Sequence, residues 1–207
     1  MVPVLDKRRR NDPRREATER ALLDAALALL DEGVAFADLN VKRITERAGR
    51  TRPAFYAHFE DRRELLFALL EQAGGQALNA LGPFIAGAGR ATEPEVVTST
   101  RALLDSFAQN ATLVRAVTEA AGYDDAVAAY WASIVDQIIG GAEQRLQAEG
   151  LTVHDAHATA TALVWMTERL CYQQTVRRAT DLTDDAAVAA ISRVWWSTLC
   201  MARTQAP

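Results

Sequence analysis

The stretch from Asn40 to Leu66, NVKRITERAGRTRPAFYAHFEDRRELL, decides how the N-terminal part of this 207-residue chain folds. It predicts a short helix, a tight turn, a second short helix and the start of a longer third. Gly49 ends the first helix, because glycine tolerates the left-handed conformation that such an end needs. Phe55 and Phe59 lie four residues apart and predict a buried anchor for the second helix. Two helices joined by a turn of about three or four residues match a helix-turn-helix.

Residues with helix-capping chemistry stand at each predicted boundary. Asn40 is a good N-cap for the first helix, and Thr51 can cap the second. Pro53 suits a first helical turn, where backbone N–H groups lack partners in any case. Asp61 and Glu64 form a capping-box-like start for the third helix.

The residue types around the turn favour DNA binding over a plain helical hairpin. Hairpins with glycine turns also occur in ordinary bundles, so the spacing alone leaves the two interpretations about equal. Basic and polar side chains shift the balance, because the second helix of a helix-turn-helix enters the major groove. We expect Arg52, Pro53 and Ala57 to approach base edges, and Tyr56, His58 and Arg62 to hold phosphates. The full set of predicted DNA-contacting residues is Lys42, Arg43, Arg50, Thr51, Arg52, Pro53, Tyr56, Ala57, His58 and Arg62.

Charge is divided unevenly along the chain. Basic residues outnumber acidic ones in residues 1–63, although the whole chain carries a formal net charge of −4. The run Lys7–Arg10, with Arg14 and Arg15, predicts a basic arm that contacts phosphate or the minor groove. An acidic chain can still bind DNA, because the local field decides the encounter.

The rest of the chain shows helical periodicity and almost no strand signal, so we predict an all-α protein. The domains expected are a basic arm with the helix-turn-helix in residues 1–63, and a helical ligand-binding and dimerisation domain in residues 64–207. We expect Gly82-Pro83 to stop the helix that follows the motif. The predicted helices span about 14–32, 64–81, 95–109, 111–121, 123–149, 152–178 and 184–203.

No export or catalytic signal is evident. The charged N-terminus lacks the apolar region of a signal peptide, so we expect a cytoplasmic protein without membrane contact. Cys171 and Cys200 fit small buried hydrophobes better than a disulfide. His154 and His157 could share one helical face, but a third ligand is not evident. We therefore expect no metal site, no cofactor and no enzymatic activity.

The helix-turn-helix block resembles the TetR family of bacterial transcriptional regulators, above all in Ala48-Gly49, Phe55-Tyr56 and Phe59. Arg62 departs from the family pattern, in which a lysine is frequent. A narrower likeness, to the subfamily of the ethionamide-activation repressor, rests on residues 160–169, Trp131 and the region of Trp195.

This resemblance implies an effector cavity in the helical bundle, dimerisation through the last two helices and a double-stranded DNA operator of roughly two-fold symmetry. The implied effector is small and mostly apolar, held near Phe107, Trp131 and Trp195, with Thr167 or Glu168 as polar anchor. Small residues Ala158, Ala162, Ala187 and Ala190 would permit close approach in a homodimer. The implied cavity lining comprises Ser99, Leu103, Phe107, Trp131, Val135, Ile138, Val164, Thr167, Glu168, Cys171, Tyr172 and Trp195.

The sequence therefore predicts a ligand-responsive repressor. An activator of the same fold, or a regulator that answers to a protein partner, remains the alternative. A helical enzyme or metal-binding protein is a distant third, because no catalytic constellation is found.

Overall fold

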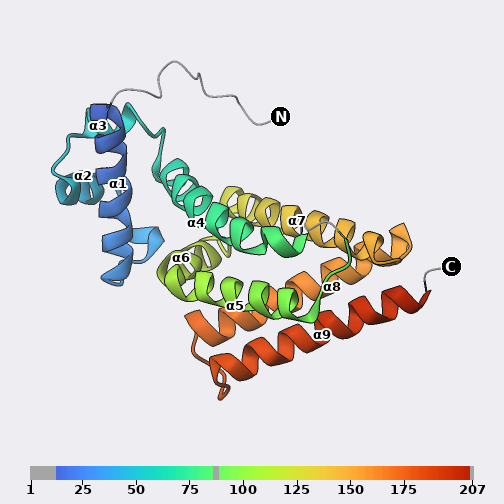
Figure 1. Ribbon diagram of the computed structural model, residues 1–207. Coiled ribbons are helices and arrows are strands. Elements are labelled where there is room, and N and C mark those ends of the chain that lie inside the picture. The colour runs from blue at the N-terminus through green and yellow to red at the C-terminus, as the bar shows by residue number, and fades with distance from the viewer. Residues whose placement is uncertain (1–12, 86–88, 206–207) are drawn as a thin grey trace. The chain divides into compact units, whose positions relative to one another are not determined.

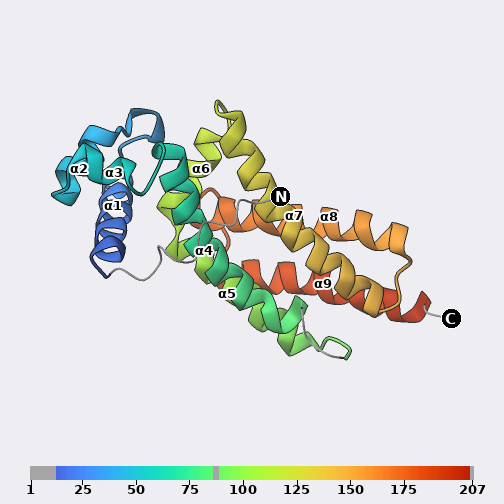
Figure 2. The ribbon, with the colours of Figure 1, turned by 90° about the horizontal axis from the view of Figure 1, so that it is seen from above.

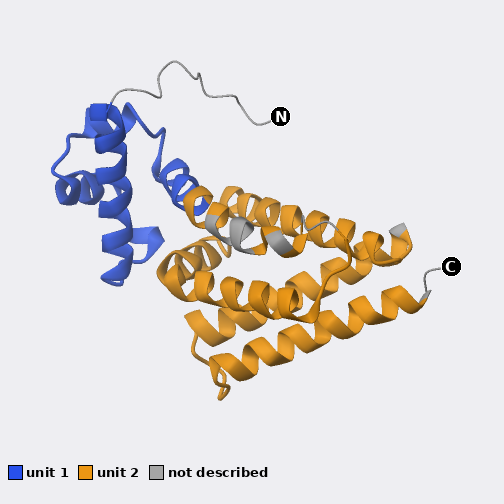
Figure 3. Ribbon diagram, in the orientation of Figure 1, with its two compact units in different colours: residues 1–70 blue, residues 71–207 orange. Residues whose placement is uncertain are grey.

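The computed structural model describes residues 13–85 and 89–205, which form helices and connecting turns with no strand (Figure 1). The chain divides into two compact units, residues 1–70 and residues 71–207 (Figure 3). The division expected from sequence, after residue 63, falls a little earlier. The all-α class is confirmed.

The first unit is built around the helix-turn-helix. Helix α1 packs against both α2 and α3. Phe55 is fully buried between them, and Phe59 is 4% exposed, so the predicted aromatic anchor is confirmed. The elements of this unit are α1 (Pro13–Asp31), η2 (Phe36–Asp38), α2 (Val41–Ala48), α3 (Arg52–Tyr56) and the start of α4 (Arg62–Ile85).

The basic residues that follow the predicted arm are helical. Arg14 and Arg15 belong to the first turn of α1, as the helix predicted over about 14–32 requires. The run Lys7–Arg10 lies outside the described residues. Within α1, the buried side chains include Leu22, Ala26 and Leu30, at spacings of four residues. This spacing places them on one face of the helix, as burial of an amphipathic helix requires.

The second unit is a helical bundle. Helix α5 lies along α9, and α7 lies along α8, as Figures 1 and 2 both show. Apolar side chains from all these helices form one buried cluster. The elements are the rest of α4, α5 (Glu93–Gln109), α6 (Ala111–Ala120), α7 (Asp125–Ala148), α8 (Val153–Cys171), η3 (Tyr172–Val176) and α9 (Asp184–Gln205).

Two predicted helix ends are wrong. Helix α4 continues through Gly82 and Pro83 to Ile85. Leu81 and Phe84 are 7% and 5% exposed in its last turns, and their burial outweighs the helix-breaking residues beside them. Helix α8 ends at Cys171, earlier than expected, and passes into the π-helical turn η3.

Candidate DNA-binding and ligand-binding sites

The turn of the helix-turn-helix has the predicted capping. The side chain of Asn40 accepts a hydrogen bond from the Arg43 N–H at 3.1 Å, and that of Thr51 accepts one from the Ala54 N–H at 3.3 Å. Gly49 ends α2 with φ 61°, the left-handed conformation expected of it. Two side-chain caps and one left-handed glycine therefore set where α2 and α3 begin and where α2 ends.

Most of the predicted DNA-contacting side chains lie on the exposed surface of this motif. Tyr56 is 58% exposed, although its neighbour Phe55 is fully buried. The short helix α3 therefore has one face in the core and one face in solvent. The exposed members of the predicted set are Lys42, Arg43, Arg50, Thr51, Arg52, Pro53, Tyr56 and Ala57.

His58 differs from the prediction. Its side chain is only 6% exposed, and Nδ1 lies 3.5 Å from Oε2 of Glu19 on α1. Helix α3 ends at Tyr56, so His58 has already turned away from the exposed helical face. We therefore correct its placement: His58 packs inward, beside the ring of Phe59.

The side chain of Arg62 is partly buried and donates hydrogen bonds to backbone carbonyls of the same unit instead of facing outward. Its Nη1 donates to the carbonyl oxygens of Phe36, Ala37 and Leu39 at 3.1, 2.7 and 2.9 Å. Its guanidinium carbon lies 5.0 Å from the centroid of the Phe36 ring. The phosphate contact of Arg62 stays a prediction, whereas its hydrogen bonds within the first unit are observed.

Arg15 is a contact that the sequence did not indicate. Its Nη2 donates to the carbonyl oxygen of Ala57, the residue that caps α3, at 3.0 Å. The two residues lie 42 positions apart, so no local pattern could have revealed the pair.

The side chains of the predicted ligand site lie in the core of the second unit. They come from α5, α7, α8, η3 and α9. Phe107, Trp131 and Ile138 are partly buried and pack against the main apolar cluster. The buried members, each 8% exposed or less, are Ser99, Leu103, Val135, Val164, Thr167, Glu168, Cys171, Tyr172 and Trp195.

Thr167 and Trp195 satisfy each other. The indole Nε1 of Trp195 donates to Oγ1 of Thr167 at 3.0 Å, and that hydroxyl donates to the Leu163 carbonyl at 2.8 Å. Trp195 also packs edge-on against Phe84 of α4, with ring centroids 5.5 Å apart. Both polar groups thus have partners within the core.

Glu168 is different, because its buried charge is poorly compensated. The residue is 7% exposed, and Oε2 has no hydrogen-bond partner among the described residues. Arg169 Nε lies 3.8 Å from that oxygen, beyond hydrogen-bonding distance. Burial raises the pKa of the Glu168 carboxyl, and the charge of Arg169 offsets this only in part. The pairing of Glu168 with Arg169 is therefore present but weak.

Cys171 is a buried thiol beside this carboxylate. Burial, followed by the nearby charge of Glu168, raises the pKa of Cys171 to about 12. A thiol with that pKa stays protonated at neutral pH, so it behaves as a small hydrophobe. Cys171 and Cys200 are both free cysteines.

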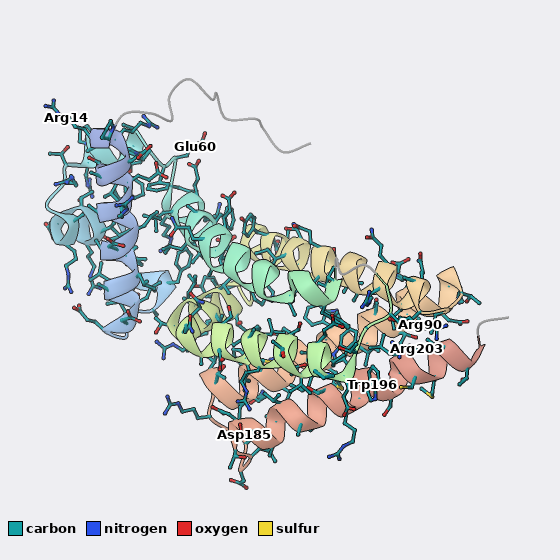
Figure 4. The ribbon with its side chains drawn as sticks, in the orientation of Figure 1. Arg14, Glu60, Arg90, Asp185, Trp196 and Arg203 are labelled. Atoms are coloured by element: carbon teal, nitrogen blue, oxygen red, sulfur yellow. The ribbon has the colours of Figure 1, made fainter. Side chains whose placement is uncertain are left out.

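A buried ionic cluster at the end of the second unit escaped sequence analysis. Glu149, 2% exposed, accepts hydrogen bonds from the Ala91 N–H and from Arg203 Nε, each at 2.6 Å. Arg145 Nε lies 3.7 Å from Glu149, and Arg145 Nη1 donates to the Gly89 carbonyl at 2.8 Å. Figure 4 shows Arg203 on α9 near Arg90.

The histidines of α8 do not gather a metal-ligand set. His157 Nδ1 lies 2.9 Å from Oε2 of Glu143, and both groups are within reach of solvent. Residues 13–85 and 89–205 hold no group of three or more potential ligands.

Family models match both parts of this chain. The model for the bacterial regulatory proteins of the tetR family matches residues 22–69, and the model for the C-terminal domain of the transcriptional regulator EthR matches residues 96–200. The chain belongs to the TetR family of transcriptional regulators, with an EthR-type C-terminal domain. It is a DNA-binding regulator and not an enzyme.

One similar protein spans nearly the whole chain, and another matches a shorter part of it. The HTH-type transcriptional regulator EthR of Mycobacterium tuberculosis is 26% identical over 195 residues, which cover 91% of this chain and 89% of that protein. An HTH-type regulator of Haemophilus influenzae is 37% identical over 60 residues, only 29% of either chain.

Solved structures of low sequence identity share the fold. A protein described as a TetR-family regulator from Syntrophomonas wolfei superposes with a TM-score of 0.73 at 16% identity, covering 89% of this chain and 96% of that one. A transcriptional regulator of Pseudomonas aeruginosa PAO1 has a TM-score of 0.72 at 20% identity, covering 96% and 97%. None of the helices among the described residues is long and apolar enough to cross a membrane.

Proposed function

We propose that this TetR-family regulator is a cytoplasmic, homodimeric repressor that releases a roughly two-fold DNA operator when a small, mostly apolar effector binds its second unit. The observation that carries the proposal is a buried carboxylate in an apolar, aromatic core. Glu168 has an oxygen without a hydrogen-bond partner among the described residues. A buried polar group in that state favours any ligand that completes its hydrogen bonding.

Glu168, and not Thr167, is the polar anchor in this proposal. The hydroxyl of Thr167 already donates to Leu163 and accepts from Trp195. An ionised carboxylate accepts hydrogen bonds and cannot donate them. The effector is therefore expected to present an N–H or O–H group on a mostly apolar body.

Release of DNA requires that the effector bind two conformations with unequal affinity. A tenfold loss of operator affinity needs about 1.4 kcal/mol of coupling, within the usual range. Phe84 near the end of α4 touches Trp195 of the proposed site. A ligand that displaces Trp195 would therefore act directly on the helix that begins at Arg62.

The dimer is proposed to form through α8 and α9. Trp165, Val194 and Met201 are 40%, 42% and 57% exposed, which is unusual for large apolar side chains on the last two helices. Ala158, Ala162 and Ala190 are exposed as the proposed interface requires. Ala187 is fully buried within its own chain and is removed from that set.

A matched pair of ligands tests the effector site. Secondary amides and esters of the same chain length differ in one N–H donor, so an anchor at Glu168 favours the amide. Loss of a hydrogen bond to a charged group is expected to cost roughly 1.5–3 kcal/mol, about tenfold or more in affinity. Tryptophan quenching measures binding, and a mobility shift on DNA upstream of the chain's own gene measures release.

The control for this test is Glu168→Gln, which should reduce the preference for the amide, because a neutral carbonyl is a weaker acceptor than a carboxylate. Filling the core with Ser99→Trp should mimic or block the effector. A transcription assay with that same DNA separates repression from activation. If no amide, ester or fatty acyl compound quenches tryptophan or moves DNA, the ligand-responsive proposal loses its support.

A further inference from the structure

We propose that Arg62 is a positioning residue: it sets the start of α2 by holding three backbone carbonyls, and it does not bind DNA phosphate. The inference rests on the DNA-binding function of the first unit. It concerns how that unit is held in its reading conformation, whatever the effector is.

The contacts converge on one short segment. All three carbonyl acceptors lie in Phe36–Leu39, and a single nitrogen of Arg62 donates to them at 2.7–3.1 Å. Phe36 and Leu39 are 2% and 0% exposed, so the segment is anchored in the core on its other side. The guanidinium also covers the Phe36 ring at 5.0 Å, which fixes the plane of the group.

This segment leads directly into α2. The 3-10 turn η2 ends at Asp38, and the Leu39 N–H already donates to the Phe36 carbonyl, so Arg62 adds a second donor there and also reaches the Ala37 and Leu39 carbonyls. Leu39 is followed by Asn40, whose side chain caps α2. Arg62 therefore fixes backbone one residue away from the cap that sets where α2 begins.

Arg62 is also the first residue of α4, so it joins two elements far apart in sequence. A shift of the first turn of α4 would pull on the Leu39 carbonyl and so on the entry to α2. The planar guanidinium transmits such a shift through several bonds at once, which a lysine ammonium cannot reproduce with the same geometry.

A phosphate contact by the same nitrogen would compete with this arrangement. Nη1 would have to leave three carbonyls, among them that of fully buried Leu39, whereas the Phe36 carbonyl would keep the Leu39 N–H. Stripping partners from buried carbonyls is costly, because their desolvation is no longer compensated. The inward role and an outward phosphate role of Nη1 therefore exclude each other.

Arg63 provides a matched control. It occupies the next position of α4, its side chain is about half exposed, and its Nη1 lies 3.9 Å from Oδ2 of Asp61. Arg63→Ala removes the same charge from the same helical turn. Any difference between the two alanine variants thus reports on contacts and not on net charge.

The experiment uses full-length protein and a pool of random-sequence DNA duplexes. Bound sequences are selected with wild type, Arg62→Ala, Arg62→Lys and Arg63→Ala, and affinities for the selected and an unselected duplex are measured over a range of salt. We expect Arg62→Ala to lower the ratio of selected to unselected affinity about tenfold or more. We also expect the salt slope of Arg62→Ala to equal that of Arg63→Ala. Arg62→Lys keeps the positive charge, but it should not restore the ratio of selected to unselected affinity.

Two results would overturn the proposal. One is a slope of log affinity against log salt concentration that is about 0.9 smaller for Arg62→Ala than for Arg63→Ala, as the loss of one phosphate contact produces. In that case Arg62→Lys would restore the wild-type slope. The other is an equal loss of affinity for both duplexes. If wild type selects no sequence at all, the DNA-binding premise fails instead, and this outcome is distinct from both.

Amide hydrogen exchange gives an independent readout. Arg62→Ala should speed exchange at Leu39 and in the first turn of α2, whereas Arg63→Ala should not. Should Arg62→Ala fail to fold, Phe36→Leu removes the aromatic face and keeps every carbonyl. The same loss of sequence preference is expected from it, and unchanged preference with unchanged exchange would contradict the inference.

Discussion

Two buried glutamates of the second unit have pKa values shifted in opposite directions. Burial alone would raise the pKa of Glu149, but hydrogen bonds from Arg203 and the Ala91 N–H, with the charges of Arg203 and Arg145, lower it on balance. Burial raises the pKa of Glu168, and only Arg169 opposes it. The two carboxyls therefore contribute to stability in opposite ranges of pH.

The first prediction concerns Glu149. Its lowered pKa means that its contribution is present above the ordinary carboxyl pKa of 4.5 and is lost as pH falls through the folded value. Glu149→Ala removes the carboxylate that buried Arg145 and partly buried Arg203 share, and it is expected to cost roughly 3–5 kcal/mol at neutral pH. Urea unfolding between pH 7 and pH 3 measures this. A variant as stable as wild type at pH 7 would refute the assigned role.

The second prediction has the opposite sign. The raised pKa of Glu168 means that its contribution is complete below 4.5 and is lost as pH rises through the folded value. Glu168→Gln should therefore be more stable than wild type at neutral pH, and the difference should disappear in acid. Thermal unfolding at several pH values measures this difference. The control variant is Glu46→Gln, which makes the same change at an exposed glutamate on α2.

The third prediction concerns Arg52, at the exposed start of α3. If its guanidinium reads guanine, Arg52→Ala should relax preference at one base pair by roughly 1–3 kcal/mol. Arg115→Ala removes the same charge from an exposed position on α6 and should leave base preference intact. The measurement is the affinity of each variant for duplexes that differ at a single base pair. An unaltered base preference in Arg52→Ala would exclude base reading by Arg52.

At the scale of the element, the local sequence predicts a helix boundary well where a single capping residue sets it. Asn40, Thr51 and Gly49 act as expected, because each capping contact lies within a few residues. Another signal, Thr92 with Glu95, is a full capping box that starts α5 at Glu93, two residues earlier than predicted. The T-x-x-E pattern of a capping box could have revealed it.

Contacts between distant segments set the limit of prediction. His58 faces inward because Glu19 and Phe59 lie beside it, and Arg62 faces inward because the segment Phe36–Leu39 offers it three carbonyls. Neither partner can be read from a helical pattern. The side chains that the family resemblance implied for the ligand site lie buried or partly buried in the second unit, yet the pairing of Thr167 with Trp195 could be seen only in the folded chain.

The fourth prediction compares the effect of replacing glycine by alanine at a helix end and inside a helix. Gly49 has a left-handed φ of 61°, whereas Gly74 lies inside α4, and a Cβ at either position meets no atom within 4 Å. Gly49→Ala should therefore cost roughly 1–2 kcal/mol from backbone strain alone. Gly74→Ala should stabilise the helix by roughly 0.5–1 kcal/mol. Urea midpoints that move in the same direction for both variants would contradict this assignment.

At the scale of the whole molecule, the exposed apolar side chains of α8 and α9 predict a dimer. The fifth prediction is that wild type sediments as a dimer at micromolar concentration and that Val194→Asp sediments as a monomer. The aspartate places a charge among apolar side chains that the interface would desolvate. Val97→Asp, at a similarly exposed position on α5, is the control and should remain dimeric. A monomeric wild type would contradict the proposed assembly.

The cluster of Arg145, Glu149 and Arg203 also constrains how this protein can diverge. Losing Glu149 leaves Arg145 and Arg203 without their shared carboxylate, and losing either arginine leaves Glu149 with one cation instead of two. Exchanging all three for apolar side chains of like volume removes the desolvation cost altogether. Intermediate genotypes are therefore less fit than either end state. Among descendants of a common ancestor, these three codons should change together or stay unchanged together, although they lie up to 58 positions apart from one another.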